Sequence, residues 1–462
     1  MNETRGLVEQ CHRIRFEDLE PEAVDRTKYL FLDFLGVAGR GSQGRTARRL
    51  GRSLEDLGGA QRGSVVIGAG PGTGPAWAAL ANGVAAHSVE MDDVVNEASL
   101  HPGVIVFPAV LAAAGLASSS GRELIAAAVA GYETAIRLGV ALDPAAHYAR
   151  GFHPTSTCGV FGAAVAAGKL LGLDQEGLTR ALGIAGSQAA GSLEFLSDGS
   201  ETKPFNAGWA AHGGLVAALL ARQGFSGPAT IIEGRHGFLQ GYSDAARADR
   251  VLSGWGRPYQ VLRTSIKPHA CCRYKQGPID ALLEIRAKHR PDPDRIQAVE
   301  VAVLRAGQAL VAEPPEQKRR PRTIVDAQFS MPFGVAVALL YGRAGIETYV
   351  EENLASPRVR ALMDKVRCVT DEEIEVGFPR RWAAKARLRT EAGEVHEAGL
   401  AHPKGDPENP LSWEELIEKY NQLSGPVFSE KRREKTIRTV RSLESLPDPG
   451  PLENLLRAEG DG

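Results

Sequence analysis

The stretch from Ala81 to Pro108, ANGVAAHSVEMDDVVNEASLHPGVIVFP, sets the interpretation of the whole chain. It begins with small residues typical of a closely packed helix and reaches two adjacent carboxylates, Asp92 and Asp93. A polar loop then leads to His101, and an apolar helix is predicted directly after it. Ionisable groups between two buried helices are expected to face a cleft, because loops held by a rigid scaffold often carry function.

Four later stretches repeat this arrangement, with polar side chains beside helices rich in Gly and Ala. Each stretch also has a structural explanation, because His153 and Ser330 stand where helix caps are expected and both lysines can be solvated. The candidate residues are Tyr148 and His153 in the first stretch, Lys203 in the second, Lys267 and Arg273 in the third, and Ser330 in the fourth.

Composition and charge exclude several classes of protein. Hydrophobic residues make up 43% of the 462 residues and charged residues 24%, which is typical of a globular protein. The net charge of −2 gives no basic surface for nucleic acid, and no apolar run approaches the ~18 residues of a membrane span. The five cysteines show no disulfide framework, and the N-terminus lacks the apolar core of a secretory signal. We therefore expect a cytoplasmic protein that binds neither nucleic acid nor membrane.

The pattern of apolar residues predicts a mainly α protein with two domains. Helices are predicted near residues 17–36, 44–58, 75–92, 104–118, 121–140, 156–171, 175–190, 207–223 and 227–234. Further on, the alternation of IQAVEVAVL and the hairpin pattern of AKARLRTEAGEVHEAGL add strands to helices at 276–288, 330–342 and 356–364. Helices return at 412–423 and 428–443, before a tail rich in Pro, Gly and acids. We expect a large all-helical domain over residues 1–265, completed by residues 405–462, and a smaller α+β lid domain over residues 266–404.

Seven segments together resemble the MmgE/PrpD family, in the family's order and from about residue 20 to residue 423. The family includes 2-methylcitrate dehydratase, cis-aconitate decarboxylase and iminodisuccinate epimerase. The resemblance implies a helical domain with an α+β lid, a homodimer, and activity without a metal or an organic cofactor. The segments are ANGVAAHSVEMDD, HPGVIVFPAVLAAA, GFHPTSTCGVFGAAVAAGKLLG, KPFNAGWAAHGGLVAALLARQGF, KPHACCRY, DAQFSMPFGVAVALL and NPLSWEELIEKY.

The three activities share a chemical requirement, since each weakens a bond next to a carboxylate of a small polycarboxylate. Such a site needs cations that hold the substrate and a group that moves a proton. Lys203, Lys267 and Arg273 supply positive charge, and Arg is suited to bidentate carboxylate binding. His153, Tyr148 and a desolvated Lys267 are the candidates for proton transfer.

The resemblance adds further site residues. Asp93 resembles the family's site carboxylate, which we expect to orient a neighbouring imidazole or ammonium, and His101 belongs to the family's HP loop. Gln276 and Ser330 are predicted to contact the substrate. The chain departs from the family's pattern at Val94, Val95, Gln276 and Phe333, where Thr, His, His and Tyr are common. These departures remove proton donors that a dehydratase or decarboxylase could use.

Three functions are compatible with these residues. The first is a cofactor-independent lyase, a dehydratase or decarboxylase, that acts on a small di- or tricarboxylate. The second is an isomerase of the iminodisuccinate epimerase type, with Tyr148 and Lys267 as proton carriers on opposite faces of a carbon acid. The third is a catalytically inactive homologue that binds a ligand or a partner protein, although intact Lys203, His153 and Lys267 argue against it. We also predict that the site lies between the domains, with Lys267 close to His153 or Lys203.

Overall fold

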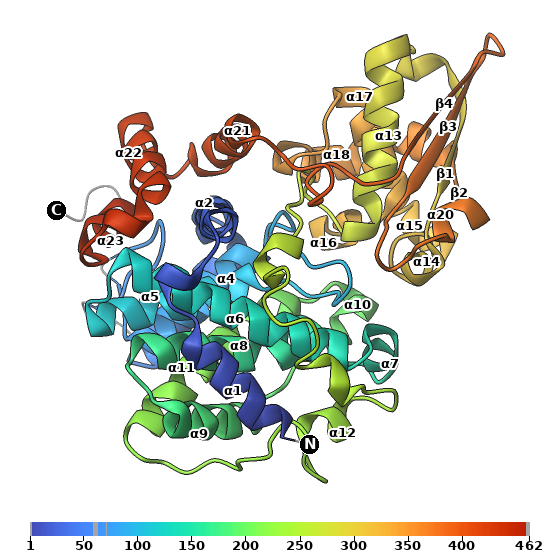
Figure 1. Ribbon diagram of the computed structural model, residues 1–462. Helices are drawn as coiled ribbons and strands as arrows, with labels where there is room; N and C mark the ends of the chain where they lie inside the picture. The colour runs from blue at the N-terminus through green and yellow to red at the C-terminus, as the bar shows by residue number, and fades with distance from the viewer. Residues whose placement is uncertain (1, 59–62, 71, 459–462) are drawn as a thin grey trace.

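The computed structural model describes residues 2–58, 63–70 and 72–458, which form a large helical domain and a smaller α+β domain (Figure 1). The mainly α fold agrees with the sequence prediction. The helices of the large domain are α1 (Glu3–Arg13), α2 (Pro21–Ser42), α3 (Arg45–Asp56), α4 (Pro75–His87), α5 (Gly103–Ala117), α6 (Gly121–Ala141), α7 (Pro144–Ala149), α8 (Pro154–Leu170), α9 (Gln175–Gly186), α10 (Phe195–Asp198), α11 (Thr202–Arg222), α12 (Phe238–Tyr242), α21 (Trp413–Ser424), α22 (Glu430–Arg441) and α23 (Gly450–Leu456), with 3-10 helices η1 (Phe16–Asp18), η2 (Ala248–Arg250), η3 (Gln260–Arg263) and η6 (Leu443–Ser445).

Small residues let α4 and α11 pack backbone to backbone. A Cβ atom at Gly83 of α4 would lie 2.7 Å from the Cα atom of Gly208 in α11, so a larger residue at this contact would push the helices apart. Gly83 lies near the end of α4, and Gly208 lies near the start of α11. The contact therefore brings His87, the last residue of α4, to the same end of the domain as Lys203 in the first turn of α11.

Helix α8 begins at this same end of the domain. The Ser156 hydroxyl in its first turn donates a hydrogen bond of 2.8 Å to the carbonyl oxygen of Asn206 in α11. Further along, α8 crosses α6 so closely that a Cβ atom at Gly162 would lie 2.7 Å from the carbonyl oxygen of Gly131. His153, which precedes α8, is thereby placed beside the beginning of α11.

Helix α6 is long and apolar enough to cross a membrane, but its surroundings explain that composition. In the apolar window within Gly121–Ala141, 94% of the residues are buried inside the molecule. Helices α5 and α8 pack against it, so it is the central helix of a globular domain.

The α+β domain contains a four-stranded sheet in the order β2-β1-β3-β4. Strand β1 pairs in parallel with β2, where Val299 faces Val366, and antiparallel with β3, where Val299 faces Leu388. The predicted hairpin is formed by β3 and β4. The elements of this domain are α13 (Arg273–His289), η4 (Pro293–Arg295), β1 (Ile296–Ala302), α14 (Arg305–Val311), α15 (Pro315–Lys318), α16 (Ile324–Gln328), α17 (Met331–Tyr341), η5 (Ile346–Thr348), α18 (Glu351–Ala355), α19 (Pro357–Asp364), β2 (Val366–Val369), α20 (Glu372–Glu375), β3 (Ala384–Thr390) and β4 (Val395–Leu400).

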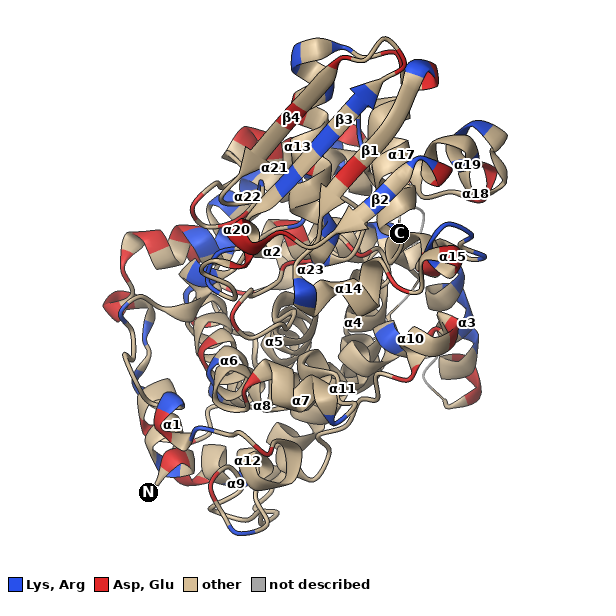
Figure 2. Ribbon diagram, turned by 90° about the vertical axis from the view of Figure 1, so that its right-hand side faces the viewer, with Lys and Arg blue, Asp and Glu red and all other residues tan. Residues whose placement is uncertain are grey.

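One face of this sheet is covered and the other faces solvent. Helix α13 packs against β3 and β4 on the covered face. Along β3, buried residues alternate with more exposed ones, which is the pattern of a sheet with one solvated face. The charged residues of β3 and β1 are seen on the open face in Figure 2. The sheet therefore forms the outer layer of the α+β domain, and the helices of this domain lie on the side that faces the helical domain (Figure 1).

The C-terminal helices pack against the helical domain. Lys419 of α21 lies 2.6 Å from the carboxylate of Asp33 in α2, and the Tyr29 hydroxyl donates to the carbonyl oxygen of Leu411 at 2.9 Å.

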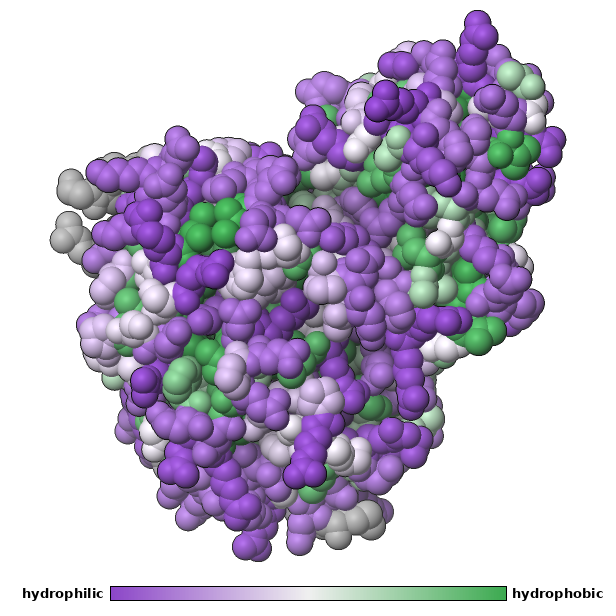
Figure 3. Space-filling model, turned by 45° about the horizontal axis from the view of Figure 1, so that its top comes forward, coloured by the Kyte–Doolittle hydropathy of each residue, from purple (hydrophilic) through white to green (hydrophobic). Residues whose placement is uncertain are grey.

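On the face shown in Figure 3, apolar residues form separate patches within a polar surface, as is usual for globular proteins.

One local prediction was wrong, and two elements were not predicted. Residues 227–234 form turns rather than a helix, because a Cβ atom at Gly227 would lie 2.5 Å from the carbonyl oxygen of Arg180 and the backbone packs directly on α9. Strand β2 was not predicted, since its four residues gain their structure from pairing with β1. The tail contains α23, in which Leu452 and Leu456 are buried.

Candidate active site

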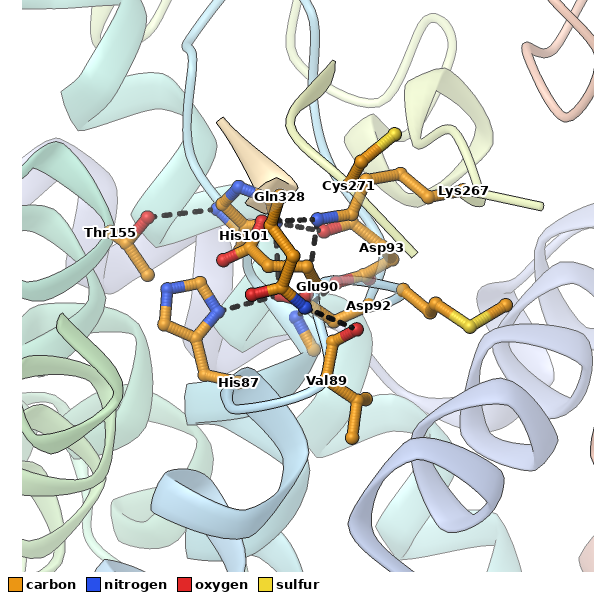
Figure 4. A network of polar contacts seen from close by, with 12 residues as sticks. His87, Val89, Glu90, Asp92, Asp93, His101, Thr155, Lys267, Cys271 and Gln328 are labelled. Carbon is orange, nitrogen blue, oxygen red and sulfur yellow. Dashed lines mark hydrogen bonds and ion pairs between the residues drawn. The ribbon is translucent and has the colours of Figure 1, made fainter. Parts of the chain in front are cut away.

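Asp92 lies at the centre of a buried polar cluster between the two domains (Figure 4). Its Oδ2 atom is 2.8 Å from His87 Nδ1 and 2.9 Å from His101 Nδ1, and its Oδ1 atom is 3.2 Å from Lys267 Nζ. Burial alone would raise the pKa of Asp92. The Lys267 ammonium and the two imidazoles outweigh burial and hold that pKa well below its usual range. Asp92 is therefore an anion at neutral pH.

The loop between α4 and α5, which carries Asp92 and His101, contains residues in uncommon backbone conformations. Glu90 and Ser99 have φ angles of 57° and 50°, which are uncommon for residues other than glycine and cost about 1–2 kcal/mol each. His101 is held on two sides, because its backbone N–H donates to Thr155 Oγ1 at 3.2 Å and its Nδ1 lies 2.6 Å from the carbonyl oxygen of Asp93. Backbone strain of this kind is concentrated at functional sites.

Two neutral imidazoles of the cluster have nitrogen atoms without a protein partner. Burial lowers the pKa of His87 well below its usual value, with Lys203 adding to the effect, and burial lowers the pKa of His153 to about 3. The two rings are nearly parallel, with centroids 5.7 Å apart. Within the described part of the chain, His87 Nε2 and His153 Nδ1 are buried and lack a hydrogen-bond partner. Because buried polar atoms are almost always paired, these nitrogens indicate a place for a ligand.

Two lysines bring positive charge to the same place. Lys203 Nζ forms an ion pair with Glu90 Oε1, and Lys267 Nζ lies 3.3 Å from Glu90 Oε2. All three side chains are buried. Burial and the Lys267 ammonium lower the pKa of Lys203, but the Glu90 carboxylate in contact with it stabilises the charged form. We therefore treat Lys203 and Glu90 as an ammonium–carboxylate pair.

The α+β domain closes the cluster from the other side. Gln328, the last residue of α16, donates from Nε2 to the carbonyl oxygen of Val89 at 3.5 Å (Figure 4). The ring centroid of Phe329 lies 5.6 Å from Lys203 Nζ. Lys267 comes from the segment that joins the domains, and it shares Glu90 with Lys203. The expected proximity of the two lysines is therefore present, at the junction of the domains.

Asp93 does not have the expected contacts. Its carboxylate accepts hydrogen bonds from the Tyr132 hydroxyl at 2.6 Å and from the backbone N–H of Gly103 at 2.9 Å, while the neighbouring Asp92 contacts the imidazoles and the ammonium. A Cβ atom at Gly103 would lie 2.8 Å from both carboxylate oxygens, so glycine is needed there. Asp93 therefore anchors the start of α5, and within the described residues its carboxylate contacts no imidazole or ammonium.

The Asp93→Asn variant tests the buried carboxyl group. Burial raises the pKa of Asp93 to about 7, whereas an unfolded Asp ionises near pH 4. Between about pH 4 and pH 7 the folded state keeps a proton that the unfolded state has released, so this group's contribution to stability falls as pH rises, by at most ~1.4 kcal/mol per pH unit. We expect wild type to lose stability relative to Asp93→Asn over this window. Urea denaturation of both proteins near pH 5 and near pH 7 measures the difference between their free energies of unfolding. An equal difference at the two pH values would contradict the raised pKa of Asp93.

Three predicted substrate-binding residues are engaged in structural contacts. Arg273 donates to Asn96 at 2.8 Å and to Asp406 at 2.5 Å. The Gln276 amide is hydrogen-bonded to the backbone of residues 269 and 271. Ser330 caps α17, accepting from the Phe333 N–H at 3.1 Å. Arg273 thus joins the domains, while Gln276 and Ser330 hold their own loops in this conformation.

Tyr148 lies at the edge of the cluster rather than within it. Its hydroxyl donates to the carbonyl oxygen of Ser99 at 3.3 Å, two residues before His101. Burial raises the pKa of Tyr148, so the phenol keeps its proton at neutral pH. In this position Tyr148 is available as a proton donor, but within the described part of the chain its hydroxyl forms no hydrogen bond with Lys267, its expected partner in an isomerase.

His87, Asp92 and His101 have ligand atoms close enough to share a metal ion. The Asp92 oxygen between the two imidazoles lies within 3 Å of both Nδ1 atoms, and its other oxygen faces the Lys267 ammonium. A divalent cation at this place would be repelled by Lys267. In this conformation the three residues form a polar triad that Lys267 completes.

The sequence prediction missed His87, Glu90 and the role of Asp92. The signal was present in His87-Ser88-Val89-Glu90-Met91-Asp92-Asp93, where three carboxylates follow directly on an apolar helix. Carboxylates are rarely buried without a cation, so this run indicates that lysines from elsewhere must meet it.

An open cavity of about 690 Å³ lies beside the cluster, on the outer side of the loop at residues 95–97. None of the cluster residues named above lines this cavity. The positive charge of the cavity would attract anions toward the domain junction. The guanidinium groups in its walls belong to Arg137, Arg250, Arg257, Arg263 and Arg380.

Comparison with known proteins identifies the family of the chain. The chain matches the MmgE/PrpD N-terminal domain over residues 5–250 and the MmgE/PrpD C-terminal domain over residues 269–445. It is 30% identical to cis-aconitate decarboxylase of Aspergillus terreus, over 98% of this chain and 96% of that protein. It is 30% identical to the cis-aconitate decarboxylase-like protein oryM of Aspergillus oryzae, over 99% and 98%, and 27% identical to cis-aconitate decarboxylase of Homo sapiens, over 98% and 94%. Because both domains match in order and over most of the chain, this protein belongs to the MmgE/PrpD family.

Proposed function

We propose that this protein is a lyase of the decarboxylase or dehydratase type that acts on a small di- or tricarboxylate without a metal or an organic cofactor. The observation that carries the proposal is the burial of Lys203 and Lys267 beside two neutral imidazoles at the domain junction. Buried cations need anionic partners, and a polycarboxylate supplies them. Relatives named cis-aconitate decarboxylase make cis-aconitate the first compound to test.

The cluster contains groups for each step of such a reaction. In a decarboxylation, the C–C bond to one carboxylate breaks, CO2 leaves, and the electron pair passes through the adjacent double bond toward a remaining carboxylate until the carbon takes up a proton. In a dehydration, a proton leaves the carbon next to a carboxylate, and hydroxide leaves with a proton. Lys203 and Lys267 stabilise the negative charge that develops on carboxylate oxygens. His153, with a neutral imidazole, is our first candidate to move the proton, and Tyr148 and Lys267 are the alternatives.

The test is a panel of polycarboxylates followed by proton NMR in deuterated buffer that contains EDTA. We expect one compound to be consumed, with loss of CO2 or water and with deuterium at the protonated carbon after decarboxylation. Deuterium incorporation without net elimination would instead identify the isomerase. Binding without turnover would identify an inactive homologue. Loss of activity in EDTA that a single added metal restores would contradict cofactor independence.

The Lys203→Met variant should raise KM by roughly 10- to 100-fold and change kcat less. The lysine holds a carboxylate that is present in both ground and transition states, and a charged hydrogen bond is worth about 1.5–3 kcal/mol. Steady-state kinetics on the identified substrate measure both constants. Lys169→Met is the matched control, because Lys169 donates to carbonyl oxygens of His12 and Ile14, away from the cluster. An unchanged KM for Lys203→Met would remove Lys203 from the binding site.

The homodimer and the cytoplasmic location also remain proposals. Light scattering on the purified protein measures the mass in solution, and fractionation of cells measures the location. A monomer at micromolar concentration, or a membrane-bound fraction, would contradict them.

A further inference from the structure

Glu90 occupies a central place between the two lysines of the cluster. One carboxylate oxygen contacts Lys203 Nζ, and the other lies 3.3 Å from Lys267 Nζ. The side chain is only 4% exposed, and its backbone is in the left-handed region. A residue that bridges two ammonium groups from a strained backbone position is held there by its surroundings.

The charges of the two ion-paired lysines and of their carboxylate partners already balance without a ligand. Lys203 and Lys267 carry two positive charges, and Glu90 and Asp92 carry two negative charges. His87 has a depressed pKa and adds no charge at neutral pH. A polycarboxylate brings at least two further negative charges, and buried charges without partners are strongly unfavourable. A substrate therefore cannot simply be added to this cluster.

We propose that the place held by Glu90 between Lys203 and Lys267 is the binding subsite for one substrate carboxylate, and that Glu90 gives up both lysines when the substrate binds. The proposal rests on the proposed function, because it assumes a carboxylate substrate. In the complex, one substrate carboxylate would contact both Lys203 and Lys267. In the free protein Glu90 supplies the negative charge that the lysines need, and in the complex the substrate supplies it.

Exchange of one carboxylate for another has a measurable consequence. Glu90 competes with the ligand, so its removal should strengthen ligand binding, whereas removal of an ordinary binding or supporting residue weakens it. Gln has nearly the same shape as Glu and carries no charge. The Glu90→Gln cluster keeps two ammonium groups with only Asp92 to balance them, which favours an incoming carboxylate.

The experiment is calorimetric titration of the full chain with propane-1,2,3-tricarboxylate, a saturated probe that cannot be turned over by elimination. We expect Glu90→Gln to bind it at least ~10-fold more tightly than wild type does, because a like charge no longer faces the ligand. Glu444→Gln is the matched control, since Glu444 also pairs with a buried lysine, Lys28, at 3.2 Å, but lies between α2 and the C-terminal helices. The control should bind as wild type does.

The binding data separate the role of Glu90 from the proposed substrate class. Equal or weaker binding by folded Glu90→Gln, with binding by wild type, overturns the role of Glu90 and leaves the proposed function standing. Failure of both proteins to bind contradicts the proposed substrate class as well. If Glu90→Gln is unfolded in the absence of ligand, propane-1,2,3-tricarboxylate should restore its folding, because ligand carboxylates replace the missing partner of the lysines. Circular dichroism measures the folding. A variant that stays unfolded with the ligand also overturns the proposal.

Discussion

In the Lys267→Met variant, turnover per folded molecule should fall by ~10²-fold or more, and the free energy of unfolding should fall by ~3–5 kcal/mol. Lys267 Nζ lies 3.3 Å from Glu90 Oε2 and 3.2 Å from Asp92 Oδ1, and all three side chains are buried. Without Lys267, the buried carboxylates of Glu90 and Asp92 share a single ammonium, that of Lys203, so one buried negative charge is left without a cation. Turnover falls because Lys267 stabilises developing negative charge and is a candidate proton carrier. Urea denaturation and kcat normalised to folded protein measure the two effects.

The matched control for this variant is Lys28→Met. Lys28 is also a buried lysine, with an ion pair of 3.2 Å to Glu444 and a hydrogen bond to the carbonyl oxygen of Arg441, but it lies between α2 and the C-terminal segment. We expect the control to lose stability and to keep its turnover per folded molecule. If Lys267→Met behaves in the same way, Lys267 is a structural residue and the site must be reassigned.

The helical domain was predictable because its sequence satisfies two requirements at once. Apolar residues at helical spacing define α5, α6 and α8, and small residues such as Gly83 and Gly162 allow close packing. The hairpin of β3 and β4 was predictable from alternation around a turn with Gly393. Strand β2 was not, because a four-residue segment becomes a strand only when β1 lies beside it.

The candidate site was predicted in its composition more than in its geometry. Lys203 and Lys267 were singled out from the sequence, and the structure brings them to the same carboxylate. Asp93 was singled out from the sequence, but the structure places the carboxylate of Asp92 beside the imidazoles. Adjacent residues point in different directions, and the course of the loop decides which one faces the imidazoles. Only the folded chain shows that the Asp93 carboxylate meets Tyr132.

Glu90 escaped prediction for a related reason. In the sequence it is one acid among three, and helical spacing would continue α4 through it. The helix instead ends at His87, and a positive φ angle at Glu90 turns the side chain toward the lysines. Backbone conformations of this kind depend on contacts with distant segments, here α11 and the segment of Lys267, which no local pattern records.

The His153→Gln variant should lower kcat by ~10²-fold or more with a smaller change in KM, if His153 is the proton carrier. Burial lowers the pKa of His153 to about 3 in the free protein, so the imidazole is neutral at physiological pH. A substrate carboxylate beside the ring would raise this pKa toward the range suited to proton transfer. Its Nδ1 atom is buried without a protein partner in the described residues, which leaves it free for this purpose. Gln keeps a polar side chain of similar length but cannot exchange a proton in this pH range. Steady-state kinetics on the identified substrate, normalised to folded protein, measure the effect.

A second buried histidine separates the chemical role from a structural one. His147 has both ring nitrogens engaged, Nδ1 with the carbonyl oxygen of Tyr242 and Nε2 with the hydroxyl of Thr157, each at 2.8 Å. His147→Gln should therefore lose stability through broken hydrogen bonds, by about 1–3 kcal/mol, and keep its turnover per folded molecule. If His153→Gln also keeps normal turnover while Tyr148→Phe loses it, the proton is carried by Tyr148 at the edge of the cluster. The free nitrogen of His153 would then serve to bind the substrate rather than to transform it.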